Sequence, residues 1–225
     1  MEINQNNENQ NQMQLPEPTV SGTYGHGWEI MKKNFPELLL VMLIQVLLSL
    51  PVGFTRGLLF GSLMTTGFFQ IVYGLLVLAP VSYGSSWVFL KAVRGETFKV
   101  QDIFFAYQSF GNVLLSQILV SLIVMAGIIM LIVPGIIFAC KLAFVPFLVM
   151  DEKMEAAEAI RKSWNMTNGH AGTIFLMGLT AFFVGIGGLI CFVVGIFPAI
   201  IWISLAFACI YHVVSVKAKE PVQQG

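Results

Sequence analysis

Six apolar runs constrain this chain more than any other feature, because each is long enough to cross a lipid bilayer as a helix. Hydrophobic residues make up 56% of the chain and charged residues only 11%, whereas a soluble domain carries about 25% charged residues. Lipid must therefore surround most of the surface, and apolar runs of this length satisfy their backbone hydrogen bonds as helices. We expect an all-α, polytopic membrane helix bundle with six transmembrane helices. The runs cover about residues 37–54, 65–90, 110–133, 136–150, 171–195 and 198–216.

The membrane domain is expected over residues 23–218, between two tails. Residues 1–22 are rich in Asn and Gln and contain few apolar residues, which predicts a disordered segment. Residues 219–225 form a second, short tail.

Three segments outside the runs have apolar residues at helical spacing. They lie within residues 26–35, 100–107 and 151–170, and we expect each to form a short amphipathic helix in the membrane interface. In the third segment, Glu158 precedes Lys162 by four residues, the order that favours an ion pair on one helix.

Prolines are expected to shape the runs. Pro80 and Pro146 lie within runs and should kink them. Pro134-Gly135 predicts a tight turn between the third and fourth runs, and a further turn is expected near Gly195–Pro198.

Basic residues lie almost entirely on one side of the predicted membrane. Of the twelve Lys and Arg, only Arg56 falls on the opposite side and only Lys141 falls inside a run. Because Lys and Arg are retained in the cytoplasm, we expect both termini in the cytoplasm and the chain in a bacterial cytoplasmic (inner) membrane. The remaining basic residues flank the side shared by both termini: Lys32, Lys33, Lys91, Arg94, Lys99, Lys153, Arg161, Lys162, Lys217 and Lys219.

Lys141 is the most distinctive polar residue, because a Lys inside a membrane costs about 2.5–3.5 kcal/mol on insertion scales. One interpretation is that it lines a polar cavity or contacts an anionic headgroup or solute. The other is that its long stem reaches the interface, or that it bonds one of the intramembrane glutamines. Those glutamines, Gln45, Gln70 and Gln117, could line a solute path or simply bond between helices.

Four glycines indicate close helix packing. Gly178, Gly185, Gly188 and Gly195 stand seven, three and seven residues apart, near one face of the expected fifth helix. Small residues let helix backbones approach each other in lipid. We expect a packing role inside the protein, or in contact with a second copy of the chain or another membrane protein.

Catalytic and cofactor motifs are missing from the sequence. It contains no serine-hydrolase elbow, zinc-protease motif or phosphate-binding loop, and no run carries paired carboxylates. We therefore expect no enzymatic activity, no cofactor and no metal ion. The formal net charge is zero, which argues against a nucleic-acid partner.

Two stretches of the chain carry a family resemblance, which covers about residues 28–215. The stretch from Leu131 reads LIVPGIIFACKLAFVPFLVMDEKMEAAEAIRKSWNMTNGHAGTIFLMGL, and an earlier stretch reads SYGSSWVFLKAVRGE. These motifs resemble a family of uncharacterised bacterial integral membrane proteins, related to the membrane domain of some glycerophosphoryl diester phosphodiesterases. The resemblance implies six transmembrane helices and a cytoplasmic helix carrying Arg161, Ser163 and Gly169. It implies no catalytic residues.

Two functional hypotheses follow. The first is a membrane domain without catalytic activity that organises lipids or partner proteins, because the sequence has three amphipathic helices and short loops on the far side. The alternative is a small transporter or channel for an anionic or polar solute, which Lys141 and the intramembrane glutamines would favour.

Overall fold

The computed structural model describes residues 17–58, 63–190 and 192–219, and every regular element within them is a helix. Six helical stretches are long and apolar enough to cross a membrane, so the predicted all-α fold with six membrane-spanning helices is confirmed. The elements are α2 (Val20–Lys33), α3 (Phe35–Leu58), α4 (Leu63–Tyr73), the π-helix η1 (Gly74–Leu78), α5 (Ala79–Val93), the 3₁₀ helix η2 (Val100–Ser109), α6 (Phe110–Met130), α7 (Ile132–Lys141), α8 (Val145–Asp151), α9 (Ala156–Met166), α10 (Ala171–Ile190) and α11 (Phe192–Lys219).

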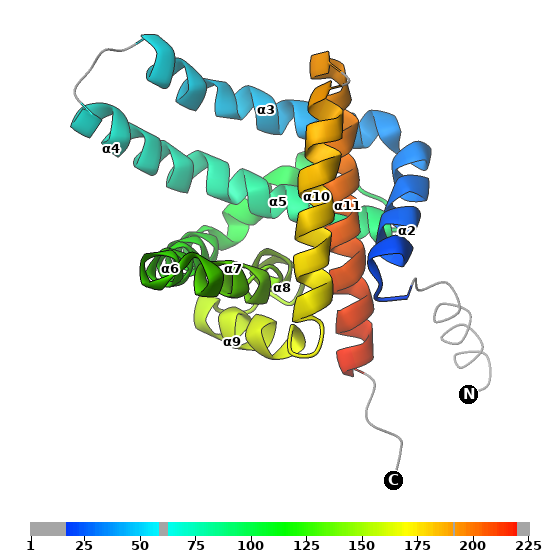
Figure 1. Cartoon of the computed structure of the whole chain (residues 1–225). Helices are drawn as coiled ribbons and strands as arrows, with labels where there is room; N and C mark the ends of the chain where they lie inside the picture. Colours follow the sequence, from blue (N-terminus) through cyan, green and yellow to red (C-terminus); the bar gives the residue numbers. More distant parts are fainter. Residues whose placement is uncertain (1–16, 59–62, 191, 220–225) are drawn as a thin grey trace, which may run out of the picture.

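Three helical hairpins leave a common centre in different directions (Figure 1). They consist of α3 with α4, α6 with α7, and α10 with α11, and the first hairpin crosses the third steeply. The central element is α11, since 61% of its span is buried, compared with 11% of the span in α10. Most of the α10 surface is therefore available to lipid.

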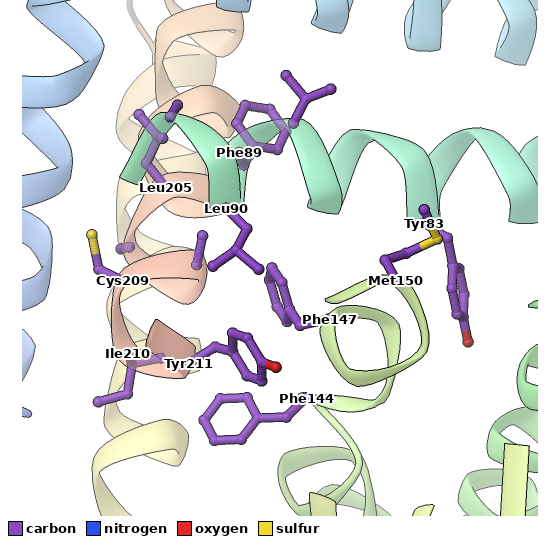
Figure 2. Packing of buried hydrophobic residues seen from close by; sticks show 14 of the residues in the cluster. Tyr83, Phe89, Leu90, Phe144, Phe147, Met150, Leu205, Cys209, Ile210 and Tyr211 are labelled. Atoms are coloured by element: carbon purple, nitrogen blue, oxygen red, sulfur yellow. The ribbon is translucent and has the colours of Figure 1, made fainter. Parts of the chain in front are cut away.

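The core lies where α5, α8 and the second half of α11 meet (Figure 2). Tyr211 of α11 stacks on Phe147 with ring centroids 5.0 Å apart and meets Phe144 edge-on at 5.6 Å. Leu90 of α5 and Leu148 of α8 are also fully buried. Aromatic pairs of this kind add about 0.5–1.5 kcal/mol each beyond the area they bury, so this centre holds the three hairpins together.

The first amphipathic segment is held against the last two helices. The Tyr24 hydroxyl of α2 donates to the backbone oxygen of Met177 at 3.1 Å, and Trp202 Nε1 donates to the backbone oxygen of Tyr24 at 2.8 Å. Trp28 remains 42% exposed. One side of α2 thus packs against α10 and α11, while another side, which carries Trp28, is exposed at the surface.

All three amphipathic segments are helical, although the second is the 3₁₀ helix η2 rather than an α-helix. The first begins earlier than the predicted tail boundary at residue 22, because the Thr19 side chain accepts a hydrogen bond from the Gly22 backbone at 3.2 Å and caps the helix. Residues 1–16 and 220–225 of the predicted tails lie outside the described residues.

The second span contains a π-helical segment where the sequence predicts a kink. η1 ends two residues before Pro80, and the Ala79 backbone N–H donates to the oxygen of Gly74, five residues earlier. Proline lacks an N–H and clashes with the carbonyl four residues before it. A wider turn directly ahead of Pro80 relieves that clash, because it moves the carbonyl away from the ring.

The fourth span is broken rather than kinked. The sequence predicts one helix over 136–150, but α7 ends at Lys141 and α8 begins at Val145. Pro146 occupies the first turn of α8, where its missing N–H costs nothing. It cannot continue α7, so the chain ends one helix and starts another.

Two predicted boundaries are misplaced. α3 passes through Pro51 and continues to Leu58, beyond the end at residue 54 that the first run predicts. α11 begins at Phe192 and contains Pro198, so the predicted turn near Gly195–Pro198 is wrong. Membrane helices tolerate an internal proline because neighbouring groups satisfy the freed carbonyl.

Replacing Gly84 with Ala is expected to separate η2 from α5. A Cβ atom at Gly84 would lie 1.8 Å from the backbone oxygen of Ile103 in η2, a contact that no rotamer change relieves. We expect the free energy of unfolding in detergent to fall by at least about 2 kcal/mol. The matched control is Gly178→Ala, since nothing lies within 4 Å of a Cβ there. Equal stability of the two variants would contradict this backbone contact.

Candidate functional site

A cavity of about 410 Å³ lies among the membrane helices, and two of the three predicted glutamines line it. Gln45 comes from α3 and Gln117 from α6, 72 positions apart in the sequence. Gln70 does not line the cavity. The complete lining consists of Met42, Gln45, Val46, Ser49, Gly74, Leu78, Ala79, Ser82, Gln117, Ile200 and Ser204.

The polar groups of this lining are amides and hydroxyls. Ser49 donates to the backbone oxygen of Val46 at 2.7 Å, and Ser82 donates to that of Ala79 at 2.9 Å. Among the described residues, no hydrogen bond uses the side chains of Gln45, Gln117 or Ser204. Their polar atoms remain available to a ligand.

One wall of the cavity is irregular. Gly74 and Leu78 belong to the π-helix η1, and both line the cavity. Next to η1, the Tyr73 hydroxyl donates to the backbone oxygen of Leu48 at 2.8 Å and ties α4 to α3. Single π-turns are frequent at functional sites, and this one shapes the only part of the described lining that is not α-helical.

Lys141 lies away from the cavity. Because α7 ends at this residue, its side chain is at a helix terminus, where Nζ donates to Oδ1 of Asn168 at 2.5 Å. The ammonium also lies over the Trp164 ring, 4.6 Å from the centroid. The structure therefore does not group Lys141 with Gln45, Gln70 or Gln117, either in a cavity or through a hydrogen bond.

The candidate cytoplasmic helix is α9, and its serine has a structural contact. Ser163 is fully buried and donates to the backbone oxygen of Lys141 at 2.7 Å, which satisfies a carbonyl that the end of α7 leaves free. Arg161 is exposed. Gly169 follows the helix with φ +85°, a conformation that favours glycine at a helix end.

The four predicted packing glycines divide into two pairs. A Cβ at Gly188 of α10 would lie 2.8 Å from that of Ala199 and 2.9 Å from the backbone oxygen of Gly195, both in α11. Gly188 therefore lets α10 approach α11 closely, and the prediction that Gly195 lies on the same helix as the other three is wrong, because Gly195 belongs to α11. Gly178 and Gly185 have nothing within 4 Å of a Cβ, so they face outward from this chain.

A buried ion pair that the sequence analysis does not identify joins three segments of the core. Arg94, directly after α5, donates two hydrogen bonds of 2.6 Å to the carboxylate of Asp151 at the end of α8. Tyr211 of α11 donates to the same carboxylate at 2.9 Å. The Asp151 side chain is only 8% exposed.

The charge state of this cluster follows from its geometry. Burial alone would lower the pKa of Arg94, but the hydrogen bonds and negative charge of Asp151 outweigh burial and hold that pKa above its usual value. The guanidinium therefore stays charged, and its fork matches the carboxylate at both nitrogens. The only signal in the sequence was an Arg and an Asp at the ends of two separate runs.

Comparison with protein-family models, with curated proteins and with solved structures finds no match to this chain. The family resemblance noted in the sequence therefore stays a prediction. Among the described residues, no group of three or more His, Cys, Asp and Glu side chains could hold a metal ion. The fold and the cavity define a multi-pass α-helical membrane protein with a partly polar cavity that has no charged side chain in its lining and lies in the size range of small-molecule sites, about 300–1,000 Å³.

Replacing Arg94 with Met is expected to destabilise the protein by about 3 kcal/mol, because the Asp151 carboxylate would lose its counter-charge while still largely buried. Denaturation in detergent, followed by tryptophan fluorescence, measures this change. The double variant Arg94→Met/Asp151→Asn should regain most of the loss, since the neutral amide still accepts from Tyr211. Lys33→Met, at an exposed position, is the control. A double variant no better than the single one would contradict the charge argument.

Proposed function

We propose that this chain is a lipid-binding membrane domain without catalytic activity of its own, and that its ligand occupies the cavity between Gln45 and Gln117. The observation that carries the proposal is the convergence of these two free amides, from different hairpins, on one cavity. Unsatisfied amides facing hydrocarbon are costly. A bound polar group would satisfy them.

The position of the cavity supports a ligand that arrives from the bilayer. Two lining residues, Ser49 and Ile200, are exposed, so the cavity is not fully enclosed by the protein. Both belong to stretches that are apolar enough to cross the membrane. Lipid surrounds such surfaces, so a lipid can reach the lining from the side without first crossing an aqueous compartment.

The chemistry of the lining supports binding rather than catalysis. General acid–base catalysis needs a titratable group within hydrogen-bond reach of the reacting atoms, and the lining contains no His, Lys, Arg, Asp or Glu. The Ser49 and Ser82 hydroxyls donate to backbone oxygens of their own helices. A serine nucleophile needs an adjacent base to take its proton, and these two have a carbonyl instead.

The double variant Gln45→Leu/Gln117→Leu should retain less lipid than the wild-type chain. Each lost hydrogen bond is worth about 0.5–1.5 kcal/mol, so the two together should lower the affinity for the retained lipid by roughly fivefold or more. Native mass spectrometry of protein extracted from its membrane counts the retained lipids. The control is Gln70→Leu, which removes an intramembrane amide outside the cavity. If all three proteins retain the same lipids in the same amounts, the cavity is not the lipid site.

A transporter or channel is the second candidate, and the π-helical wall favours it. π-bulges are frequent at functional sites, and a return of η1 to α-helical winding would change the side of the cavity formed by Gly74 and Leu78. Flux of polar solutes into proteoliposomes separates the two proposals. Solute entry above that of empty vesicles, lost in the Gln45→Leu/Gln117→Leu variant, would favour transport over lipid binding.

We also propose that the chain lies in a bacterial cytoplasmic membrane with both termini in the cytoplasm. The first turn of α2 and the last turn of α11 lie at the same end of the molecule as α9 (Figure 1). Arg161 belongs to α9 and Lys217 to the last turn of α11, and basic segments are retained in the cytoplasm.

Reporter fusions test this orientation. A fluorescent protein after Gly225 should be bright, and alkaline phosphatase at that site should be inactive, because it requires the periplasm. Alkaline phosphatase inserted after Leu131, in the connection between α6 and α7, should be active. The opposite pattern at the two sites would reverse the proposed topology.

A further inference from the structure

The cavity contains no charged side chain, and this limits the ligands that it can take. Its polar lining is Gln45, Ser49, Ser82, Gln117 and Ser204. A charged ligand in a membrane interior needs an opposite charge to offset its desolvation. Lys141, the basic residue that could have supplied one, donates instead to Asn168. An anionic group would therefore be poorly stabilised here.

The hydrogen-bond donors and acceptors of the lining further limit the ligands that the cavity can bind. A serine hydroxyl has one proton and two lone pairs. Because Ser49 and Ser82 already donate their protons to backbone oxygens, they present only acceptors to the cavity. The two glutamines and Ser204 can both donate and accept. The lining therefore offers acceptors at all five side chains and donors at three of them.

Ligand hydroxyl groups match this arrangement, because each hydroxyl can donate to one wall and accept from another. A phosphodiester or a carboxylate has no proton to give to Ser49 or Ser82 at neutral pH. An ammonium has protons to give but would have no acceptor able to neutralise its charge. The remaining lining is apolar, with Met42, Val46, Leu78 and Ile200 able to contact carbon atoms of a ring or chain.

We infer that the cavity binds an uncharged group carrying several hydroxyls, as in a glycolipid headgroup or a free sugar or polyol. This inference rests on the proposed function, since it names the chemistry of the ligand for the same cavity. The donor and acceptor pattern is shared by both sources, the lipid headgroup and the free solute.

A headgroup series tests the inference on the full-length chain in detergent. Native mass spectrometry would measure the affinity for glucosyl diacylglycerol, phosphatidylglycerol and phosphatidylethanolamine with identical acyl chains. We expect the glucosyl lipid to bind at least about tenfold more tightly than the other two. Phosphatidylglycerol is the informative comparison, because it also carries hydroxyls but adds a negative charge. Methyl glucoside and glycerol, added alone, show whether the free solute suffices without a lipid anchor.

Substitutions of the lining residues test whether the headgroup preference arises in the cavity. Gln45→Leu and Gln117→Leu should each weaken glucosyl-lipid binding by about 3- to 10-fold, the loss expected for one hydrogen bond. Ser204→Ala should weaken it by a smaller factor, while Gln70→Leu should leave it unchanged. If a Leu variant fails to fold, Gln→Met at the same position removes the amide and keeps the length of the side chain.

The possible results separate this inference from the proposed function. A preference for phosphatidylglycerol or phosphatidylethanolamine that depends on Gln45 and Gln117 would overturn the ligand class while keeping the cavity as a lipid site. If neither glutamine substitution changes the binding of any headgroup, both the ligand class and the proposed lipid site are wrong. Tight binding of methyl glucoside, lost in the Gln variants, would support the hydroxyl chemistry and identify a free solute as its source.

Discussion

A single buried carboxylate fixes the positions of the elements around it. Asp151 accepts two hydrogen bonds from Arg94, 57 positions earlier, and one from Tyr211, 60 positions later. In a low-dielectric environment a carboxylate without such partners would cost several kcal/mol. The end of α5, the end of α8 and the second half of α11 are therefore held to one point.

The remaining geometry follows from this point. Because α8 is docked there and is separate from α7, Lys141 lies at a helix end and reaches Asn168 instead of the membrane interior. Because α5 is held at its C-terminal end, its first turns place Ala79 and Ser82 in the wall of the cavity. The ion pair thus holds α5 and α8, and with them one part of the cavity wall and the helix break beside Lys141.

The sequence predicts the number and type of the helices well, because apolar runs and turn residues are local signals. It predicts partners poorly, because those depend on how helices rotate and dock. Lys162 illustrates the limit: its local pattern favours an ion pair with Glu158, yet it bonds Glu152 outside its own helix. Gln45 and Gln117 meet while Gln70 does not, and a helix that is apolar on every side gives no pattern to set its rotation. The break before Pro146 likewise depends on α8 finding a buried position.

The π-helix η1 adds one residue to the second span. A π-turn holds one residue more than an α-turn over the same rise, so η1 acts as a one-residue insertion within an otherwise regular span. Deleting one residue between Gly74 and Leu78 would restore a continuous α-helix. Since successive residues of an α-helix are about 100° apart, α4 would then rotate by that amount relative to α5. Tyr73 would turn away from Leu48, and the first hairpin would lose the bond that closes it beside the cavity.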